Sequence, residues 1–170
     1  AEVTLVAGPV ALPTPAGVAR IDVSSALEMR DAVKSALAGR HIFIAVAAVA
    51  DYRPAQAAAH KIKKGAATLA LELVANPDIL AEIAALPKPP FCVGFAAESE
   101  NLDEYAQGKR SAKKLPLVVG NLLRHGLGGE DNTIVMFDDE GRHPLGPAAK
   151  IEIARGIVAR IGQMLAGNGE

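Results

Sequence analysis

The sequence has a single cysteine, no tryptophan and few other aromatic residues. One cysteine cannot form an internal disulfide, which excludes a disulfide-stapled secreted fold. The longest apolar run, residues 42–50, is far shorter than the roughly 20 residues that a membrane-spanning helix needs. The formal net charge of -1 gives no general attraction to nucleic acid or to an anionic membrane. With no signal peptide visible, we expect a cytoplasmic protein.

Hydrophobic residues make up 50% of the 170-residue chain, and charged residues 22%. This is the composition of a protein that buries a core, not of a disordered chain. The length is that of one ordinary domain, and no repeat or low-complexity tract divides it. We therefore expect one domain over residues 1–170.

Apolar segments alternate with helical ones along the chain. The segments expected as strands are 2–7, 20–23, 41–50, 68–74, 91–96 and 117–122. The segments expected as helices are 26–37, 77–86, 101–115 and 147–165. Unbroken apolar character, as in 41–50, is typical of a strand covered on both faces of a parallel sheet. Further strands at 132–137 and 142–145 flank a turn at Gly141, which predicts a hairpin. The pattern predicts an α/β fold with a mostly parallel sheet and an antiparallel hairpin edge.

Two of the helices have capping signals. Ser25, followed by Glu28 three residues later, has the spacing of a capping box. Asn76 is expected as the N-cap of the next helix, with Pro77 at its first position and Asp78 near the positive end of its dipole.

Ligands of open α/β sheets bind beyond the carboxyl ends of the strands. Asp51 follows the apolar run and is the first candidate there, although aspartate is equally at home as a turn or cap residue. Lys61, Lys63 and Lys64 follow in an expected loop. Three ammonium groups suit a triphosphate, but a lysine cluster is more often simply solvated.

Lys109 and Lys113 are four residues apart and share one face of the helix expected at 101–115. They can clamp phosphates or face solvent. The four histidines have no ligand spacing, so no protein-built metal site is assigned. Cys92 lies in an apolar strand and is expected as a core thiol rather than a nucleophile. Residues 126–129 do not form a G-x-G-x-x-G turn and predict a plain loop.

Taken together, these segments resemble the phosphopantothenoylcysteine synthetase family. The stretches that carry the resemblance are A-A-V-A-D-Y-R-P at 47–54, K-I-K-K at 61–64, N-P-D-I-L at 76–80, V-G-F-A-A-E at 93–98, K-R-x-x-K at 109–113 and D-N at 131–132. They occur in the family's order and span nearly the whole chain. The most specific is K-x-K-K after A-D-Y-R-P. The resemblance implies a three-layer Rossmann-like fold and a nucleotide-binding ligase domain of coenzyme A biosynthesis.

The resemblance also implies a reaction. CTP activates the carboxylate of 4'-phosphopantothenate as an acyl-cytidylate, and the amine of L-cysteine displaces CMP. Mg²⁺ would be bound mainly through CTP, and no organic cofactor is implied in this domain. Lysines and the metal would stabilise the charge that builds on the phosphates. The match gives Lys61 a catalytic role and places Lys63 and Lys64 in a substrate-binding loop. The residues that it places at the nucleotide are Ala48, Asp51, Lys61, Pro77, Asp78, Ile79, Leu80, Phe95, Lys109 and Lys113.

The family resemblance further implies a homodimer, whose exchanged loops complete each site, and an upstream flavoprotein decarboxylase domain as a partner. The family begins with a strand, a Gly-rich loop and a helix that receives phosphate, and we expect this first βα unit to be absent here. That unit contributes to phosphopantothenate binding. We therefore expect the chain alone to bind CTP weakly and to leave the ligation incomplete.

Two other functions stay open. The first is a non-catalytic dimerisation or nucleotide-binding module, which would show no selectivity for CTP over ATP. The second is a dinucleotide-dependent oxidoreductase of similar fold, which is disfavoured because the sequence has no G-x-G-x-x-G fingerprint.

Overall fold

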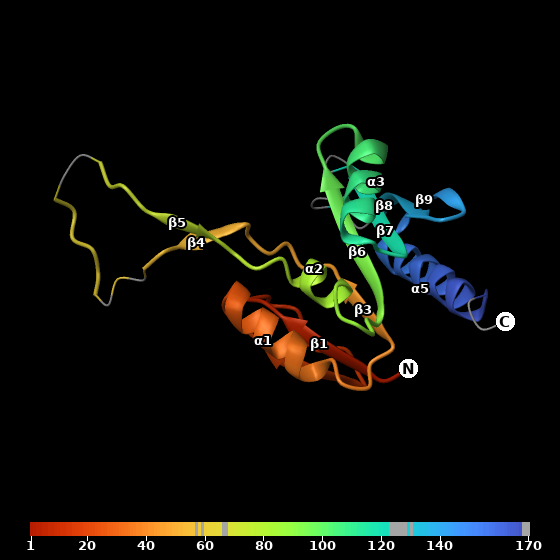
Figure 1. Ribbon diagram of the computed structural model, residues 1–170, viewed down its shortest axis with the longest axis horizontal. Coiled ribbons are helices and arrows are strands. Elements are labelled where there is room, and N and C mark those ends of the chain that lie inside the picture. The colour runs from red at the N-terminus through yellow and green to blue at the C-terminus, as the bar shows by residue number, and fades with distance from the viewer. Residues whose placement is uncertain (57, 59, 66–67, 123–128, 130, 168–170) are drawn as a thin grey trace. The chain divides into compact units, whose positions relative to one another are not determined.

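The computed structural model describes residues 1–56, 58, 60–65, 68–122, 129 and 131–167. The chain divides into two compact units (Figure 1). One consists of Ala1–Gly39 and Ala47–Glu82, and the other of Arg40–Val46 and Ile83–Glu170. The single domain expected over residues 1–170 stays a prediction.

The first unit begins with two parallel strands and a helix. Strand β1 (Val3–Ala7) pairs in register with β2 (Val18–Asp22), and helix α1 (Ala26–Ala36) follows. Ser25 is the N-cap, and its hydroxyl accepts a hydrogen bond from the Glu28 N–H at 3.2 Å. The Glu28 carboxylate in turn accepts from the backbone N–H of Ser24 at 2.7 Å. The predicted cap is confirmed, except that Glu28 accepts from the backbone N–H of Ser24 and not from that of the N-cap residue, Ser25.

The first unit also contains a narrow antiparallel ribbon. Strand β4 (Tyr52–Pro54) pairs with β5 (Leu73–Ala75) and with no other strand of the described chain. The strand expected over 68–74 is therefore shorter and begins later than predicted. Leu69 and Leu71, which give that segment its strand-like alternation, are 65% and 61% exposed. A two-stranded ribbon offers no buried face to extend the pairing along such residues.

The second unit is built on a five-stranded sheet in the order β3-β6-β7-β8-β9. Strands β3 (Ile42–Ala45), β6 (Phe91–Glu98) and β7 (Leu117–Leu122) run parallel. Strands β8 (Asp131–Asp138) and β9 (Gly141–Ala149) form the predicted hairpin and pair antiparallel at the edge of the sheet. The mostly parallel α/β fold with an antiparallel hairpin edge is confirmed.

Two helices cover the two faces of this sheet. Helix α5 (Lys150–Gly167) packs on one face. The core cluster on that side consists of Val93, Leu117, Val119, Ile134, Met136, Ile153, Ile157 and Ile161. Helix α3 (Leu102–Lys113) packs against β6 and β7. Leu102 of α3 comes so close to Gly120 of β7 that a Cβ there would lie 2.9 Å from its Cδ1. Gly120 alternates with Val119, so α3 lies on the opposite face and the unit has three layers.

The apolar run at 41–50 was predicted as a strand buried on both faces, and this is wrong for most of its length. Only Ile42–Ala45 forms a strand, and it is an edge strand that pairs with β6 alone. Ile42 and Ile44 are each 40% exposed. Hydrophobicity alone cannot distinguish a central strand from an edge one, because both present the same side chains.

The final helix also differs from the prediction. It was expected to begin at Pro147, but residues 147–149 belong to β9, where Ala148 pairs with Asn132. Hydrogen bonds to a neighbouring strand outweigh the helix propensity of this segment. No helix in the described ranges is long and apolar enough to span a bilayer.

Candidate functional site

In the first unit, a hydrogen-bonded clamp joins the two ends of the β4–β5 ribbon. The Asn76 backbone N–H donates to the Asp51 carbonyl at 2.7 Å. The Asn76 side chain donates through Nδ2 to the Ala50 carbonyl at 2.8 Å. Arg53 Nη1 donates to the Ala75 carbonyl at 2.6 Å and to Asn76 Oδ1 at 3.2 Å. The clamp therefore holds the segment around Asp51 beside the segment that begins at Asn76.

Helix α2 (Ile79–Ala84) follows the clamp directly, and its cap corrects a prediction. Asn76 was expected to be the N-cap, but Asp78 fills this position. Asp78 Oδ1 accepts from the Ala81 N–H at 3.0 Å, and its carbonyl accepts from the Glu82 N–H at 2.9 Å. The amide of Asn76 is engaged by Ala50 and Arg53 instead, so the helix starts two residues later.

The stretch from Pro77 to Leu80 was predicted to contact nucleotide. Ile79 and Leu80 are only 8% and 7% exposed, so their side chains are buried. Pro77 is half-buried and Asp78 is exposed. Any contact that Ile79 or Leu80 makes with a ligand in this arrangement involves the backbone of the first helical turn.

Lys61, Lys63 and Lys64 lie in the predicted loop, outside any helix or strand, and all three are exposed. They follow β4 on the outward part of the ribbon, away from the clamp (Figure 1). Asp51 is exposed at the base of the ribbon, and Ala48 is exposed just before it. The structure therefore brings Asp51 and residues 77–80 together and leaves the lysines further out along the same ribbon.

Two other predicted residues meet in the second unit. Lys109 of α3 donates through Nζ to the backbone carbonyl of Phe95 in β6 at 2.6 Å. Lys113 lies one turn further along the same helix. The packing of α3 on β6 creates this contact, which joins residues 14 apart in the sequence.

The second unit also has a shallow cavity of about 400 Å³ that no predicted site residue lines. Its lining residues are Arg110, Ser111, Lys114, Leu115, Pro116 and Asp139. It lies at the C-terminal end of α3, where Arg110 also pairs with Asp139. Cations at that end of a helix offset the negative end of its dipole, which accounts for this cluster structurally.

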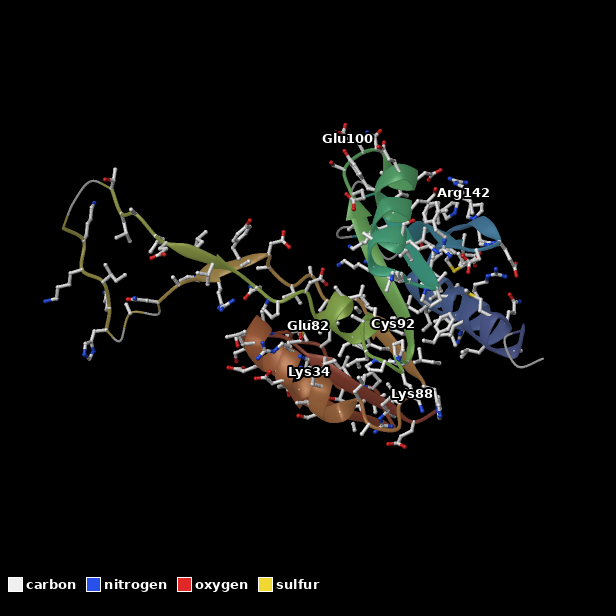
Figure 2. The ribbon with its side chains drawn as sticks, viewed as in Figure 1. Lys34, Glu82, Lys88, Cys92, Glu100 and Arg142 are labelled. Atoms are coloured by element: carbon white, nitrogen blue, oxygen red, sulfur yellow. The ribbon has the colours of Figure 1, made fainter. Side chains whose placement is uncertain are left out.

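Cys92 lies in β6 (Figure 2). The residue is 2% exposed. Burial raises the pKa of its thiol to about 11, so the group is neutral at pH 7. This agrees with a core role. Within the described residues, no three His, Cys, Asp or Glu side chains gather as a metal site. Of the glycines in the loop predicted at 126–129, only Gly129 lies within the described residues.

The profile of the DNA/pantothenate metabolism flavoprotein C-terminal domain matches residues 1–165. The chain belongs to this family. A similar family relative is the coenzyme A biosynthesis bifunctional protein CoaBC of Vibrio cholerae serotype O1 (strain ATCC 39315 / El Tor Inaba N16961). The two are 46% identical over 171 residues, which cover 97% of this chain and 43% of the relative. The chain thus spans less than half the length of that protein.

Two solved structures are similar to this chain. The crystal structure of the C-terminal domain of coenzyme A biosynthesis bifunctional protein CoaBC matches with a TM-score of 0.81 and 33% identity, covering 98% of this chain and 76% of that one. A Cab2 mutant in complex with phosphopantothenate-cysteine matches with a TM-score of 0.69 and 17% identity, covering 91% of this chain and 56% of the other. At that identity the second match shows a shared fold.

Proposed function

We propose that this chain is the nucleotide-binding part of the phosphopantothenate–cysteine ligase of coenzyme A biosynthesis, with CTP as the activating nucleotide. Family membership supports the pathway, because the relatives are bifunctional proteins of coenzyme A biosynthesis. The observation that carries the proposal is the clamp that holds Asp51 beside residues 77–80. The Asn76–Ala50 bond joins residues that are 26 apart in the sequence. The family resemblance assigns nucleotide contacts to both segments.

The proposed reaction has two steps. A carboxylate oxygen of 4'-phosphopantothenate attacks the α-phosphorus of CTP, and pyrophosphate leaves. The cysteine amine then attacks the acyl carbon, an amide bond forms, a proton is lost and CMP leaves. The first step builds negative charge on phosphate oxygens, so cations near the phosphates lower its barrier.

Lys61 is the cation that we assign to this step. Its ammonium group is exposed on a loop and is accessible to a triphosphate, and Lys63 and Lys64 raise the local positive charge. Ammonium groups are not metal ligands. The Mg²⁺ that accompanies CTP would therefore be held mainly by phosphate oxygens, and it would share the neutralisation of charge.

Asp51 is the residue that we assign to recognition of the nucleotide. Its carboxylate is exposed, while its backbone carbonyl is fixed by Asn76. A carboxylate accepts hydrogen bonds only, so it suits a base amino group or ribose hydroxyls. Phe95, Lys109 and Lys113 of the second unit stay predicted nucleotide-binding residues, from the family resemblance alone.

We also propose the partners implied by the family: a second copy of this chain, and a flavoprotein decarboxylase domain in the same protein. The exposed ribbon beyond β4 supports exchange between copies, because Ile62, Leu69, Leu71 and Leu73 are all more than half exposed. Exposed apolar side chains on a two-stranded ribbon with open edges are a common means of association.

The proposal is tested by calorimetric titration of the chain with CTP and with ATP in the presence of Mg²⁺. We expect binding of CTP and weaker binding of ATP. Asp51→Asn keeps the shape of the side chain but removes its charge, and should weaken CTP binding or reduce its selectivity. Asp31→Asn, on the exposed face of α1, is the matched control and should change neither. Equal affinity for the two nucleotides, or no binding of either, would contradict the proposed nucleotide.

A further inference from the structure

Arg53 is the least exposed of the arginine and lysine residues on the ribbon, and its side-chain hydrogen bonds within the described residues reach the opposite strand at the base of that ribbon. Its Nη1 donates to the Ala75 carbonyl at 2.6 Å and to Asn76 Oδ1 at 3.2 Å. Residue 53 is half-buried, unlike Lys61, Lys63 and Lys64. One guanidinium nitrogen, Nη1, is thus engaged within the ribbon.

The bond to Asn76 Oδ1 determines how the Asn76 amide is oriented. With Oδ1 accepting from Arg53, Nδ2 faces the Ala50 carbonyl, to which it donates at 2.8 Å. A reversed amide would place two donors against each other and two acceptors against each other, at the cost of both hydrogen bonds. Arg53 therefore fixes the orientation of Asn76, and Asn76 fixes the backbone on both sides of Asp51.

The clamp has only two short strands to support it. Strands β4 and β5 pair over three residues each, which is marginal for a ribbon in water. Side-chain hydrogen bonds to backbone carbonyls are therefore a large part of what holds the register at the base of the ribbon. A one-residue slip there would reverse the faces to which side chains point.

We infer that Arg53 is a positioning residue for nucleotide recognition, which acts through Asn76 and does not touch the nucleotide. By orienting Asn76, it keeps Asp51 and the start of α2 in the mutual arrangement that the nucleotide needs. This inference rests on the proposed function, and it adds a residue to which that function assigns no contact.

The test compares three variants of the full 170-residue chain in CTP titrations with Mg²⁺. Arg53→Met keeps the aliphatic stem and removes both hydrogen bonds. Arg53→Lys keeps the charge but presents a single ammonium in place of the planar fork. Arg30→Met, at a half-buried arginine that pairs with Asp31 on α1, is the matched control.

We expect Arg53→Met to weaken CTP binding about 10- to 100-fold, the effect of losing a charge-assisted hydrogen bond at a binding element. Arg53→Lys should recover part of this loss, and Arg30→Met should bind CTP as the unchanged chain does. Amide hydrogen exchange at Asn76 supplies a readout that is independent of the nucleotide. The Asn76 N–H, bonded to the Asp51 carbonyl at 2.7 Å, should exchange faster in Arg53→Met.

The outcomes separate this inference from the proposed function. If the unchanged chain binds no CTP, the proposed function fails and the inference fails with it. If the unchanged chain binds CTP and Arg53→Met binds it equally well, only the inference is wrong. Unchanged exchange at Asn76 in Arg53→Met would overturn the positioning role itself. Arg53→Lys provides the same comparison if Arg53→Met does not fold.

Discussion

Arg160 of α5 forms an ion pair with the carboxylate of Asp138 at the end of β8, with its Nε 2.8 Å and its Nη2 2.7 Å from Asp138 Oδ2. The Asp138 side chain is 1% exposed. Its other oxygen contacts His143 Nε2 at 2.9 Å and accepts from the Glu140 N–H at 3.0 Å. A single buried carboxylate thus links the hairpin turn to the final helix.

Asp138→Ala should lower the free energy of unfolding by about 3 kcal/mol, because removing the buried carboxylate leaves Arg160 Nε and the Glu140 N–H without their acceptor. Urea denaturation at pH 7 measures the loss. Asp139→Asn, one residue away but with a side chain that is 91% exposed, should have a far smaller effect. Equal losses in the two variants would show that Asp138 contributes no more than a surface charge.

The same carboxylate predicts a pH dependence. Burial alone would raise its pKa, but hydrogen bonds from His143, Arg160 and the Glu140 backbone together lower the pKa of Asp138 below its usual value. Its stabilising effect is then complete above the unfolded-state pKa of about 4 and is lost as pH falls through the lower folded-state pKa. The difference in unfolding free energy between the unchanged chain and Asp138→Asn should therefore shrink below about pH 4. Urea titrations at pH 7, 5, 4 and 3 test this, and a constant difference would contradict it.

Gly146 in β9 has φ +104°, and a Cβ there would lie 2.6 Å from the Asn132 carbonyl oxygen. Both the conformation and the backbone contact oppose any side chain. Gly146→Ala should destabilise the chain by about 1–3 kcal/mol. Gly162→Ala on α5, where nothing lies within 4 Å of the new methyl group, should instead stabilise it by up to about 1 kcal/mol. Thermal unfolding of both variants checks the opposite signs.

Lys61→Ala should slow formation of the acyl-cytidylate in the intact enzyme by about 10- to 150-fold, the cost of one charge-assisted contact to phosphate. The fold should be unaffected, because residue 61 is exposed and outside any helix or strand. Single-turnover measurement of the intermediate tests this. Lys88→Ala, at another exposed lysine (Figure 2), is the control, and an equal rate in both variants would remove Lys61 from the chemistry.

Local signals in the sequence predicted the second unit well. Strand β7 was predicted with the bounds that the structure has, because Leu117–Leu122 is apolar and follows a helix that ends in lysines. The hairpin turn at Gly141 was predicted from the same kind of information. The burial of a strand depends on its neighbours in the sheet, which the sequence does not show. Ile42 and Ile44 are exposed because β3 has a neighbouring strand on one side only. A sequence specifies which segments are apolar, but not which neighbours they will have.

The candidate site shows the same limit. Asp51 was predicted from its place after an apolar run, and Lys109 and Lys113 from their helical spacing. The clamp of Arg53 and Asn76 was missed, because a hydrogen bond between residues 23 apart leaves no periodic signal. The sequence also offered a local role for Asn76, as the N-cap of helix α2. In the structure Asp78 is the N-cap instead. The Asn76 amide makes a long-range contact.

Cys92 gives the chain a practical property. Because its only thiol is sealed in β6 and protonated at neutral pH, thiol-directed dyes and spin labels should leave the native protein unmarked. A cysteine introduced on the ribbon, for example Lys63→Cys, would then be the one reactive position, with no background to remove. Movement of residue 63 when CTP is added could then be followed by fluorescence in a protein that is otherwise unaltered.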